Sequence, residues 1–531
     1  MRACLTDAKH QCTMQCNTQM RQGFGSVMGY LERMFQVTKT GHVDLRDLEL
    51  QDMPSDLLGV LGTGGKGDLG QRPESAKTKK PKKAAKGPAA ITKLSLTGNK
   101  LEYLPAFVGE LSSLRKLHMD PDLIEPPLHI RDEGIAMMQQ YLRRIVTAKA
   151  QLNLDLRGMM LTQVNLHYYK LSSLTSCDLG FNSLEAVPDE VFKYTDLSWL
   201  DLRNNLLDHL PHELCALQGL RQLDARGNKI EHVPAEIFAR SALLTLSLAN
   251  NNISALGGEA PALVSVRRGL AVHKGTGSTM TVEYDDADDL KSKGCNGGDG
   301  QGYGGDGGGG GGGGGRAGGG GGGWGWGELD LGVLQNLMMP DNCLVSIPQL
   351  AGSVLTNLNL SRNMLTDGVI ERLSKLKHLR LLKVAHNRLT VIPEHIDALR
   401  ELVLFDCSHN DIETLPPDMQ QLTALCTLII SNNRIQTLPN QMFELTRLQQ
   451  LRFSNNLLQF IPTLIGQLKD LRELLVDGNQ IRSLPLELGN LLKIEKLDVD
   501  NNPGNLLPPG FAEKGLDAVM EYFTWNCRYA E

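Results

Sequence analysis

A motif that recurs about every 23 residues constrains the fold of this chain more than any other feature. It reads L-x-x-L-x-L-x-x-N-x-L-x-x-L-P, as in "LSWLDLRNNLLDHLP" from Leu197 and "LRELLVDGNQIRSLP" from Leu471. Thirteen copies carry the asparagine, namely Asn99, Asn182, Asn205, Asn228, Asn251, Asn342, Asn363, Asn387, Asn410, Asn433, Asn456, Asn479 and Asn502. Three degenerate copies have another residue at the asparagine position, namely Leu48, Asp122 and Met159. The sequence therefore predicts about sixteen repeats.

The motif predicts the local structure of each repeat. The two leucines of L-x-L point to one side and the residue between them to the other, which favours a short strand. The asparagine side chain can bind backbone groups that the following turn leaves unpaired. The L-x-x-L-P segment then crosses to the opposite side as a helical turn or short helix. One unit cannot bury its leucines alone, so stacked units must share a core. The expected fold is an α/β solenoid, with a parallel β-sheet on the concave face and short helices or turns on the convex face.

This pattern is typical of leucine-rich repeats, and its 23-residue L-P form resembles the Ras-suppressor and Ras-group-related class. The segments "GHVDLRDLELQDMP", "ITKLSLTGNKLEYLP" and "SCDLGFNSLEAVPDEVF" are similar to the family of leucine-rich repeat-containing protein 40. The resemblance implies an intracellular protein that binds other proteins, with a small GTPase or a signalling complex as the expected partner. It implies no cofactor and no small-molecule substrate.

Two insertions interrupt the repeats. Residues 60–89 include six lysines among residues 77–86, which is typical of a solvated loop or a nuclear-import signal, and residues 257–327 contain a long run of glycine. We expect both to be disordered, with the repeats on either side of the second insertion stacked directly. The predicted organisation is an N-terminal extension 1–39, repeats 40–148 with a helix at 132–147, repeats 149–256, the Gly-rich insertion 257–327, repeats 328–507 and a cap helix 508–531.

Composition narrows the class of protein. A net charge of −6 argues against a dedicated nucleic-acid binder. Ten scattered cysteines without a CxxC pair indicate reduced thiols, and the first twenty residues contain no apolar signal segment. The sequence contains no run of eighteen apolar residues, so it predicts no membrane-spanning helix. We therefore expect a cytoplasmic location, with a nuclear or ciliary one as an alternative.

Two similar segments raise a question about the architecture. "PPLHIRDEGIAMMQQYLRR" starts at Pro126 and "PPGFAEKGLDAVMEYF" starts at Pro508. The second fits an amphipathic helix that closes the end of a solenoid. The first is either an enlarged convex helix within a continuous solenoid or a true break after residue 148. Asp132 and Glu133 would lead its helix, as the helix dipole favours. Both readings remain open from the sequence.

Candidate binding residues lie at the x positions of L-x-L and two residues beyond. Trp199 is the least expected of them, and we expect Trp199 and Arg203 to point to solvent, so that changing both leaves folding almost unaltered. Aromatic and arginine side chains are enriched at binding hot spots. The predicted partner-binding residues are Trp199, Asp155, Asp178, Asp201, Asp224, Arg157, Arg203, Arg226, Lys383 and Arg452, with Ile429 and Leu475 flanking Arg452. The acidic row has an alternative reading as mere repeat consensus, in which the Asp and Arg side chains pair with each other.

Enzymatic chemistry finds no support in the motifs. His386 and His409 occupy equivalent turns and should lie close together, but two histidines without a third ligand indicate polar turn residues rather than a metal site. The sequence therefore predicts a non-enzymatic interaction scaffold. A structural component of a cytoskeletal or ciliary assembly is the alternative.

Overall fold

The computed structural model describes residues 41–50, 91–256 and 328–530, except 172, 240–241, 352–353, 504–505, 508–509 and 511–513. These residues form two compact units. Unit 1 comprises residues up to Asn182 together with Pro188–Tyr194, and unit 2 comprises Ser183–Val187 and residues from Thr195 onward. The lysine-rich segment, the whole Gly-rich insertion 257–327 and the predicted N-terminal extension lie outside the described residues, so the predictions of their disorder are not tested.

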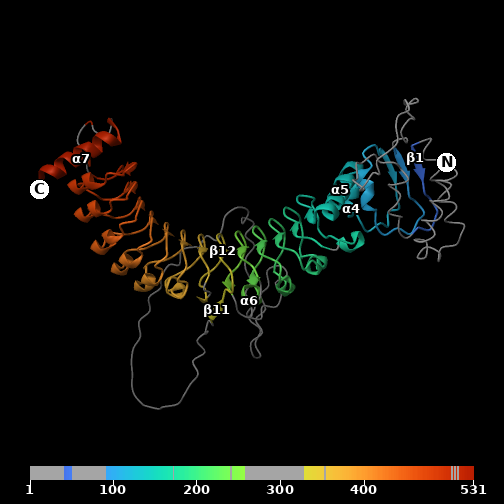
Figure 1. Cartoon of the computed structure of the whole chain (residues 1–531), viewed down its shortest axis with the longest axis horizontal. Helices are drawn as coiled ribbons and strands as arrows, with labels where there is room; N and C mark the ends of the chain where they lie inside the picture. The colour runs from blue at the N-terminus through green and yellow to red at the C-terminus, as the bar shows by residue number, and fades with distance from the viewer. Residues whose placement is uncertain are drawn as a thin grey trace, which may run out of the picture. The chain divides into compact units, whose positions relative to one another are not determined.

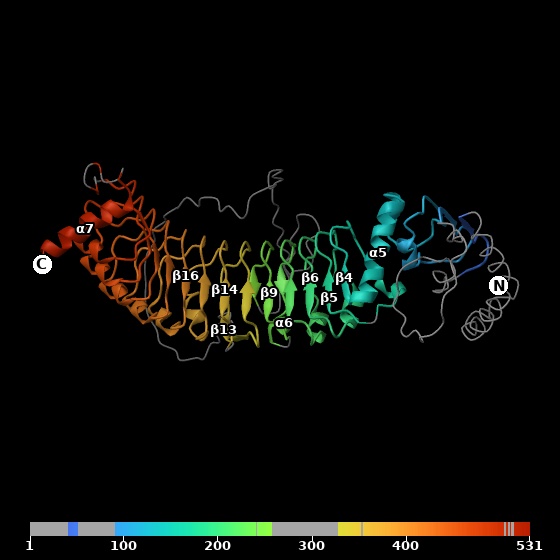
Figure 2. The same cartoon turned by 45° about the horizontal axis from the view of Figure 1, so that its top comes forward.

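Every repeat contributes one three-residue strand to a parallel sheet, as the motif predicts. In unit 1, β1–β2–β3 form one sheet, and β4 pairs with β5. In unit 2 the order is β6–β7–β9–β12–β14 and then β15 to β20 in sequence, with the strands side by side as Figure 2 shows. The repeat strands are β1 His42–Asp44, β2 Lys93–Ser95, β3 Lys116–His118, β4 Asn153–Asp155, β5 Ser176–Asp178, β6 Trp199–Asp201, β7 Gln222–Asp224, β9 Thr245–Ser247, β12 Asn336–Met338, β14 Asn357–Asn359, β15 Leu381–Lys383, β16 Leu404–Asp406, β17 Thr427–Ile429, β18 Gln450–Arg452, β19 Glu473–Leu475 and β20 Lys496–Asp498.

Two further pairs of short strands flank the Gly-rich insertion. They are β8 His232–Val233 with β10 Ala255–Leu256, and β11 Glu328–Asp330 with β13 Gln349–Ala351. The insertion does not interrupt the stacking of repeats, because β9 before it pairs directly with β12 after it. The Ile253 backbone N–H also donates to Asn342 across the gap, at 3.1 Å. The prediction that the flanking repeats stack directly is confirmed.

The opposite side of most repeats is a single 3₁₀ turn rather than an α-helix. The α-helices are α4 Leu128–Asp132, α5 Ile135–Gln151, α6 Ala235–Ala239 and α7 Leu516–Ala530. The 3₁₀ turns are η1 Ala106–Glu110, η2 Leu166–Tyr169, η3 Asp189–Lys193, η4 His212–Ala216, η5 Glu371–Leu373, η6 Glu394–Ala398, η7 Pro417–Gln421, η8 Asn440–Glu444, η9 Thr463–Gln467 and η10 Leu486–Asn490. Most of these turns follow a proline, as η1 follows Pro105 and η4 follows Pro211; proline has no N–H to leave unpaired, so it suits the start of such a turn.

The repeat asparagines form a buried hydrogen-bonded ladder, which explains why the motif carries asparagine. Asn433 accepts a bond from the Ile412 N–H of the preceding repeat at 3.0 Å and donates to the carbonyls of Cys407 and Ile430. Its side chain is 8% exposed, and its equivalents are similarly placed. One degenerate unit differs from the prediction, because Asp120 rather than Asp122 accepts bonds from the N–H groups of Gly98 and Asn99. Strand register still places Asp122 at the asparagine position, since Leu94 pairs with Leu117, but the bonds are made by the carboxylate two residues earlier.

The two Pro-Pro segments lead into helices that pack in the same way. Helix α5 lies against η1, where the Arg143 Nε donates to the Gly109 carbonyl at 2.5 Å. Helix α7 lies against η10, and the Thr524 hydroxyl donates to the Gly489 carbonyl at 3.1 Å (Figure 1). A Cβ on Gly109 would lie 2.6 Å from the backbone of α5, and a Cβ on Gly489 would lie 2.4 Å from the backbone of α7. Only glycine therefore permits this close approach. Both helices are therefore caps on the last turn of a repeat array.

The structure resolves the first segment as a break in the sheet. Strands β3 and β4 belong to different sheets, and α5 packs against both η1 and β4. The alternative of a continuous solenoid with an enlarged convex helix is wrong, because the parallel sheet does not continue from β3 to β4. The predicted helix 132–147 is also shifted, because Gly134, with a φ of 97°, separates α4 from α5 and leaves Asp132 and Glu133 outside the longer helix. At the chain end, α7 begins at Leu516 rather than 508, and Pro508 and Pro509 lie outside the described residues.

Candidate functional site

The sheet face opposite the leucine core is the candidate interaction surface of unit 2. In most strands the central residue is buried and the two flanking residues are partly exposed, because side chains alternate along a strand. The strand lies one residue earlier than the predicted L-x-L. Each repeat therefore presents two side chains on this concave face, one before and one after the first leucine.

Trp199 and Asp201 share this face on β6, but their surroundings differ from the prediction. Trp199 is half-buried, and Asp201 is only 1% exposed. The Arg203 Nε lies 3.0 Å from Asp201 Oδ2, and the Arg203 side chain is 21% exposed. The expectation that Arg203 points freely to solvent is wrong, because it neutralises a buried carboxylate. Asp224 and Arg226 form the same pair at 3.0 Å in the next repeat.

In unit 1, the predicted residues are also held by neighbours. Asp155 Oδ1 lies 3.1 Å from Arg144 of α5. The Arg157 guanidinium stands 4.5 Å above the ring of Phe181, a cation–π contact on an exposed surface. Asp178 is half-buried on β5.

The acidic row has a structural role that the sequence interpretation weighed only as repeat consensus. In each of four repeats the Asp Oδ1 accepts the N–H two residues later, at 2.9–3.2 Å, and so caps the end of the strand. These bonds join Asp155 to Arg157, Asp178 to Gly180, Asp201 to Arg203 and Asp224 to Arg226. Asp201–Arg203 and Asp224–Arg226 also form side-chain ion pairs, as the alternative reading holds, whereas Asp155 pairs with Arg144 of α5. Whether they also bind a partner stays a prediction.

A second part of the concave face is more open to a partner. The term concave patch is used here for Leu381, Lys383, Leu404, Ile429, Arg452 and Leu475, which lie on β15 to β19. All six are half-buried. Strand register places Leu381 beside Leu404, and it places Ile429, Arg452 and Leu475 in one row. The Lys383 side chain makes no hydrogen bond or ion pair with any other described residue.

Within this patch, the Arg452 side chain is held in place by an ion pair. Its guanidinium lies 2.9 Å from Glu473 Oε2, and Lys496 approaches the same carboxylate at 3.5 Å. Glu473 is 12% exposed, so the pair is partly desolvated. The sequence interpretation identified Lys383, Ile429, Arg452 and Leu475 but missed Leu381 and Leu404. These two residues could have been found from the sequence, because both are apolar at the position just before the first leucine of L-x-L, where most repeats have a polar residue.

His386 and His409 come together at the turns after β15 and β16, as predicted. Their rings stack with centroids 3.9 Å apart and planes 9° apart. Burial, together with His409 and Arg362, lowers the pKa of His386 below its usual value. Parallel rings do not direct two nitrogen lone pairs at one metal ion. Among the described residues, no group of three or more His, Cys, Asp or Glu side chains could hold a metal.

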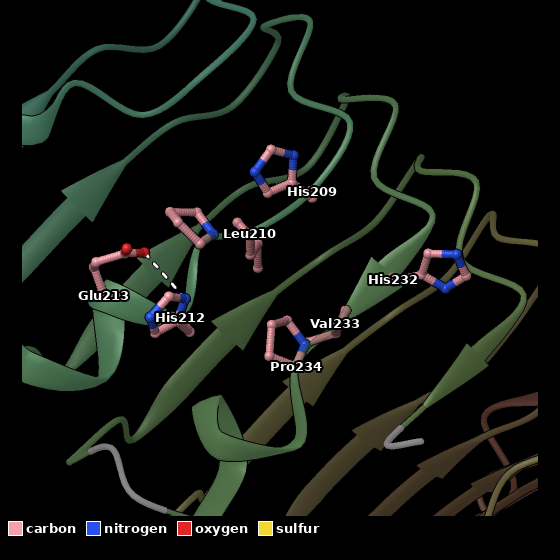
Figure 3. Close-up of a pocket in the computed structure, with 8 residues that line it drawn as sticks. His209, Leu210, His212, Glu213, His232, Val233 and Pro234 are labelled. Carbon is pink, nitrogen blue, oxygen red and sulfur yellow. Dashed lines mark ion pairs between the residues drawn. The ribbon is translucent and has the colours of Figure 1, made fainter. Parts of the chain in front are cut away.

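One shallow hollow in the described part of the chain lies away from the concave patch. It measures about 470 Å³ and is lined by His209, Leu210, Pro211, His212, Glu213, His232, Val233 and Pro234. Figure 3 shows the three imidazoles spread around it, with His212 paired to Glu213 at 3.4 Å. The rings do not converge on one point, so the hollow offers neither a metal centre nor an enclosed substrate cavity.

Within the described residues, no helix combines the length and apolar character that crossing a membrane requires.

Comparisons with known proteins identify the repeat. A family model described as a leucine-rich repeat region matches residues 337–506, and a leucine rich repeat model matches residues 172–230. A search of curated proteins finds no match, so the resemblance to leucine-rich repeat-containing protein 40 stays a prediction.

Solved structures share the fold at low sequence identity. An LRR protein of Leptospira interrogans is 22% identical, with 90% of this chain and 88% of that one covered, at a TM-score of 0.51. An internalin of Listeria monocytogenes is 15% identical, covering 68% and 84%, at 0.46. The Toll–Spatzle complex of Drosophila gives 16% identity over 79% and 51%, at 0.48. The Leptospira match, the two repeat models and the parallel repeat strands agree that this chain has the fold of a leucine-rich repeat solenoid.

Proposed function

We propose that this chain is a non-enzymatic scaffold that binds a protein partner on the concave patch of unit 2. Solenoid proteins use their extended concave faces for binding. The observation that carries the proposal is the row Ile429–Arg452–Leu475, with Leu381 and Leu404 beside it. It presents apolar side chains around an arginine held by Glu473, which is the composition of an interaction hot spot.

The class of partner rests on the resemblance to Ras-suppressor-type repeats. We further propose that the partner is a small GTPase or a signalling complex that contains one, in an intracellular pathway. Nucleotide dependence tests this finer proposal: the chain should retain a GTPase loaded with a GTP analogue more strongly than one loaded with GDP. Retention of cytoskeletal or ciliary components instead, independent of nucleotide, would favour the structural alternative.

The binding surface is tested with variants of the full chain. The partner is first isolated by affinity purification and identified by mass spectrometry. Ile429→Glu combined with Leu475→Glu should weaken its binding by more than tenfold, because two charges replace apolar contacts. Val345→Glu is the matched control, since Val345 is 51% exposed and lies outside the patch. Equal loss in both variants, or in neither, would contradict the proposed surface.

Trp199 remains a proposed second anchor. It should be tested as Trp199→Ala alone, because reversing Arg203 would strand the buried Asp201 carboxylate. Weaker partner binding at an unchanged melting temperature would support a recognition role. A lower melting temperature with unchanged binding would show that Trp199 only packs on its neighbours.

A further inference from the structure

A fully buried carboxylic acid lies in unit 1, at a repeat position that other repeats leave open to solvent. Glu125 forms an isolated parallel bridge with Tyr103, as Val391 does with Thr414. Val391 and Thr414 are exposed, whereas the exposure of Glu125 is 0%. A buried ionisable group costs stability unless it is neutral or well bonded.

Glu125 joins three segments of unit 1. The Tyr141 hydroxyl of α5 donates to Glu125 Oε2, and the Asn165 backbone N–H donates to Oε1, each at 3.0 Å. Its own backbone pairs with the preceding repeat, where the Leu104 N–H donates to the Glu125 carbonyl at 2.7 Å. One carboxyl therefore connects the end of the first array, the cap helix and the segment that leads into η2.

Among the described residues, no cation lies within ion-pair distance of this carboxyl. Around it stand Tyr141 of α5 and Tyr169 of η2, both buried, with Tyr103 packed edge-on against Tyr169 at 6.0 Å between centroids. Arg131 of α4 acts on Glu125 only through its longer-range charge. The surroundings thus favour the neutral acid, and burial raises the pKa of Glu125 from 4.5 to about 7, against the opposing effect of its hydrogen bonds.

We propose that Glu125 is a proton-operated latch that holds helix α5 in the junction when protonated and loosens it when ionised. The geometry carries this proposal: a fully buried acid, two hydrogen bonds from different segments, and no ion-pair partner. Unlike a side chain that does not ionise, the acid makes the packing of the cap responsive to pH near neutrality.

The direction of the response follows from linkage. Below pH 4.5 the carboxyl is protonated in both the folded and the unfolded chain. Between pH 4.5 and about 7 the folded state keeps a proton that the unfolded state releases, so stability falls as pH rises. Above that range both states are ionised, and the loss is complete. The equilibrium constant for opening the junction should rise on the order of 10²-fold across this window.

Hydrogen exchange of the full chain, corrected for the intrinsic pH dependence of exchange, measures this opening directly. Amides of α5 should lose protection relative to those of β16 to β19 as pH rises from 5 to 8. Glu125→Gln is isosteric with the protonated acid, so it should hold α5 protection constant over that range. Tyr141→Phe removes a donor to the carboxylate and should move the transition to higher pH.

Two results would overturn the proposal. One is an unchanged pH dependence in Glu125→Gln, which would assign the effect to another group, such as His129 of α4, whose ring bonds the Met159 carbonyl at 3.1 Å. The other is wild-type protection that does not vary with pH. If the glutamine variant does not fold, infrared spectroscopy of the wild type still decides. The carbonyl band of a buried carboxylic acid must be present at pH 5 and vanish by pH 8, and its absence at pH 5 contradicts the latch.

Discussion

At the scale of the residue, the asparagine side chains hydrogen-bond the backbone groups that each turn would otherwise leave unpaired. Asn433→Ala would leave the Ile412 N–H and the carbonyls of Cys407 and Ile430 without their partner in a buried site. We expect a loss of about 2–3 kcal/mol in the free energy of unfolding, measured by urea denaturation. The neighbour Asn432 has a φ of 59°, which glycine adopts freely, so Asn432→Gly should change stability by less than about 0.5 kcal/mol. Similar losses in both variants would show that the turn, rather than the ladder, carries the stability.

The Asp–Arg pairs permit a second test at this scale. Arg203→Ala removes the ion pair of the 1%-exposed Asp201 carboxylate, and we expect a loss of roughly 3 kcal/mol in the free energy of unfolding. Arg226→Ala affects a more exposed pair and should cost less than about 1 kcal/mol. Thermal unfolding of the two variants distinguishes a buried pair from a surface one. Equal small effects would mean that Asp201 finds another donor or is hydrated.

The sequence was informative about residues only where their role repeats. Asparagine, the paired leucines and proline recur, so their positions predict strands, turns and core. Asp201 looks the same in sequence as Asp155, yet one is buried and the other exposed, because exposure depends on neighbouring side chains rather than on the motif. The burial of Glu125 could not be predicted from the motif, because its position is exposed in other repeats and its partners Tyr141 and Asn165 lie 16 and 40 residues away.

At the scale of the element, the caps depend on two glycines. Gly489→Ala would place a Cβ 2.4 Å from the backbone of Phe523 and should displace α7, with a loss of about 1–3 kcal/mol. Gly510→Ala is the control, since it has a φ of 79° but open space around it, so it reports backbone strain of about 1 kcal/mol alone. Circular dichroism and hydrogen exchange of α7 measure both. Retention of α7 protection in the Gly489 variant would contradict its role as a contact point.

The sequence shows that the cap segment occurs twice, but it does not show that the first copy interrupts the sheet. Gly134 and Gly515 each precede a helix with an aromatic residue seven positions later, Tyr141 and Tyr522. Spacing alone did not decide between a convex helix and a break, because a long helix fits either arrangement. Packing decides, since α5 contacts both η1 and β4 and separates their sheets.

At the scale of the whole molecule, the repeats of unit 2 should form one cooperative stack despite the insertion. The β9–β12 pairing and the Ile253–Asn342 bond cross it directly. Deleting residues 262–325 should therefore leave the melting temperature and the cooperativity of unfolding nearly unchanged. Loss of cooperative unfolding in that variant would show that the insertion is structural.

The central claim, that the concave patch binds a protein partner, is tested most directly by site-specific crosslinking. A photoreactive amino acid is placed at position 429, within the patch, or at position 345, an exposed apolar site outside it. The complex with the purified partner is then irradiated and the crosslinked yield is measured. The account predicts a covalent adduct from position 429 and background yield from position 345. Background yield from 429 together with a strong adduct from 345 would contradict it.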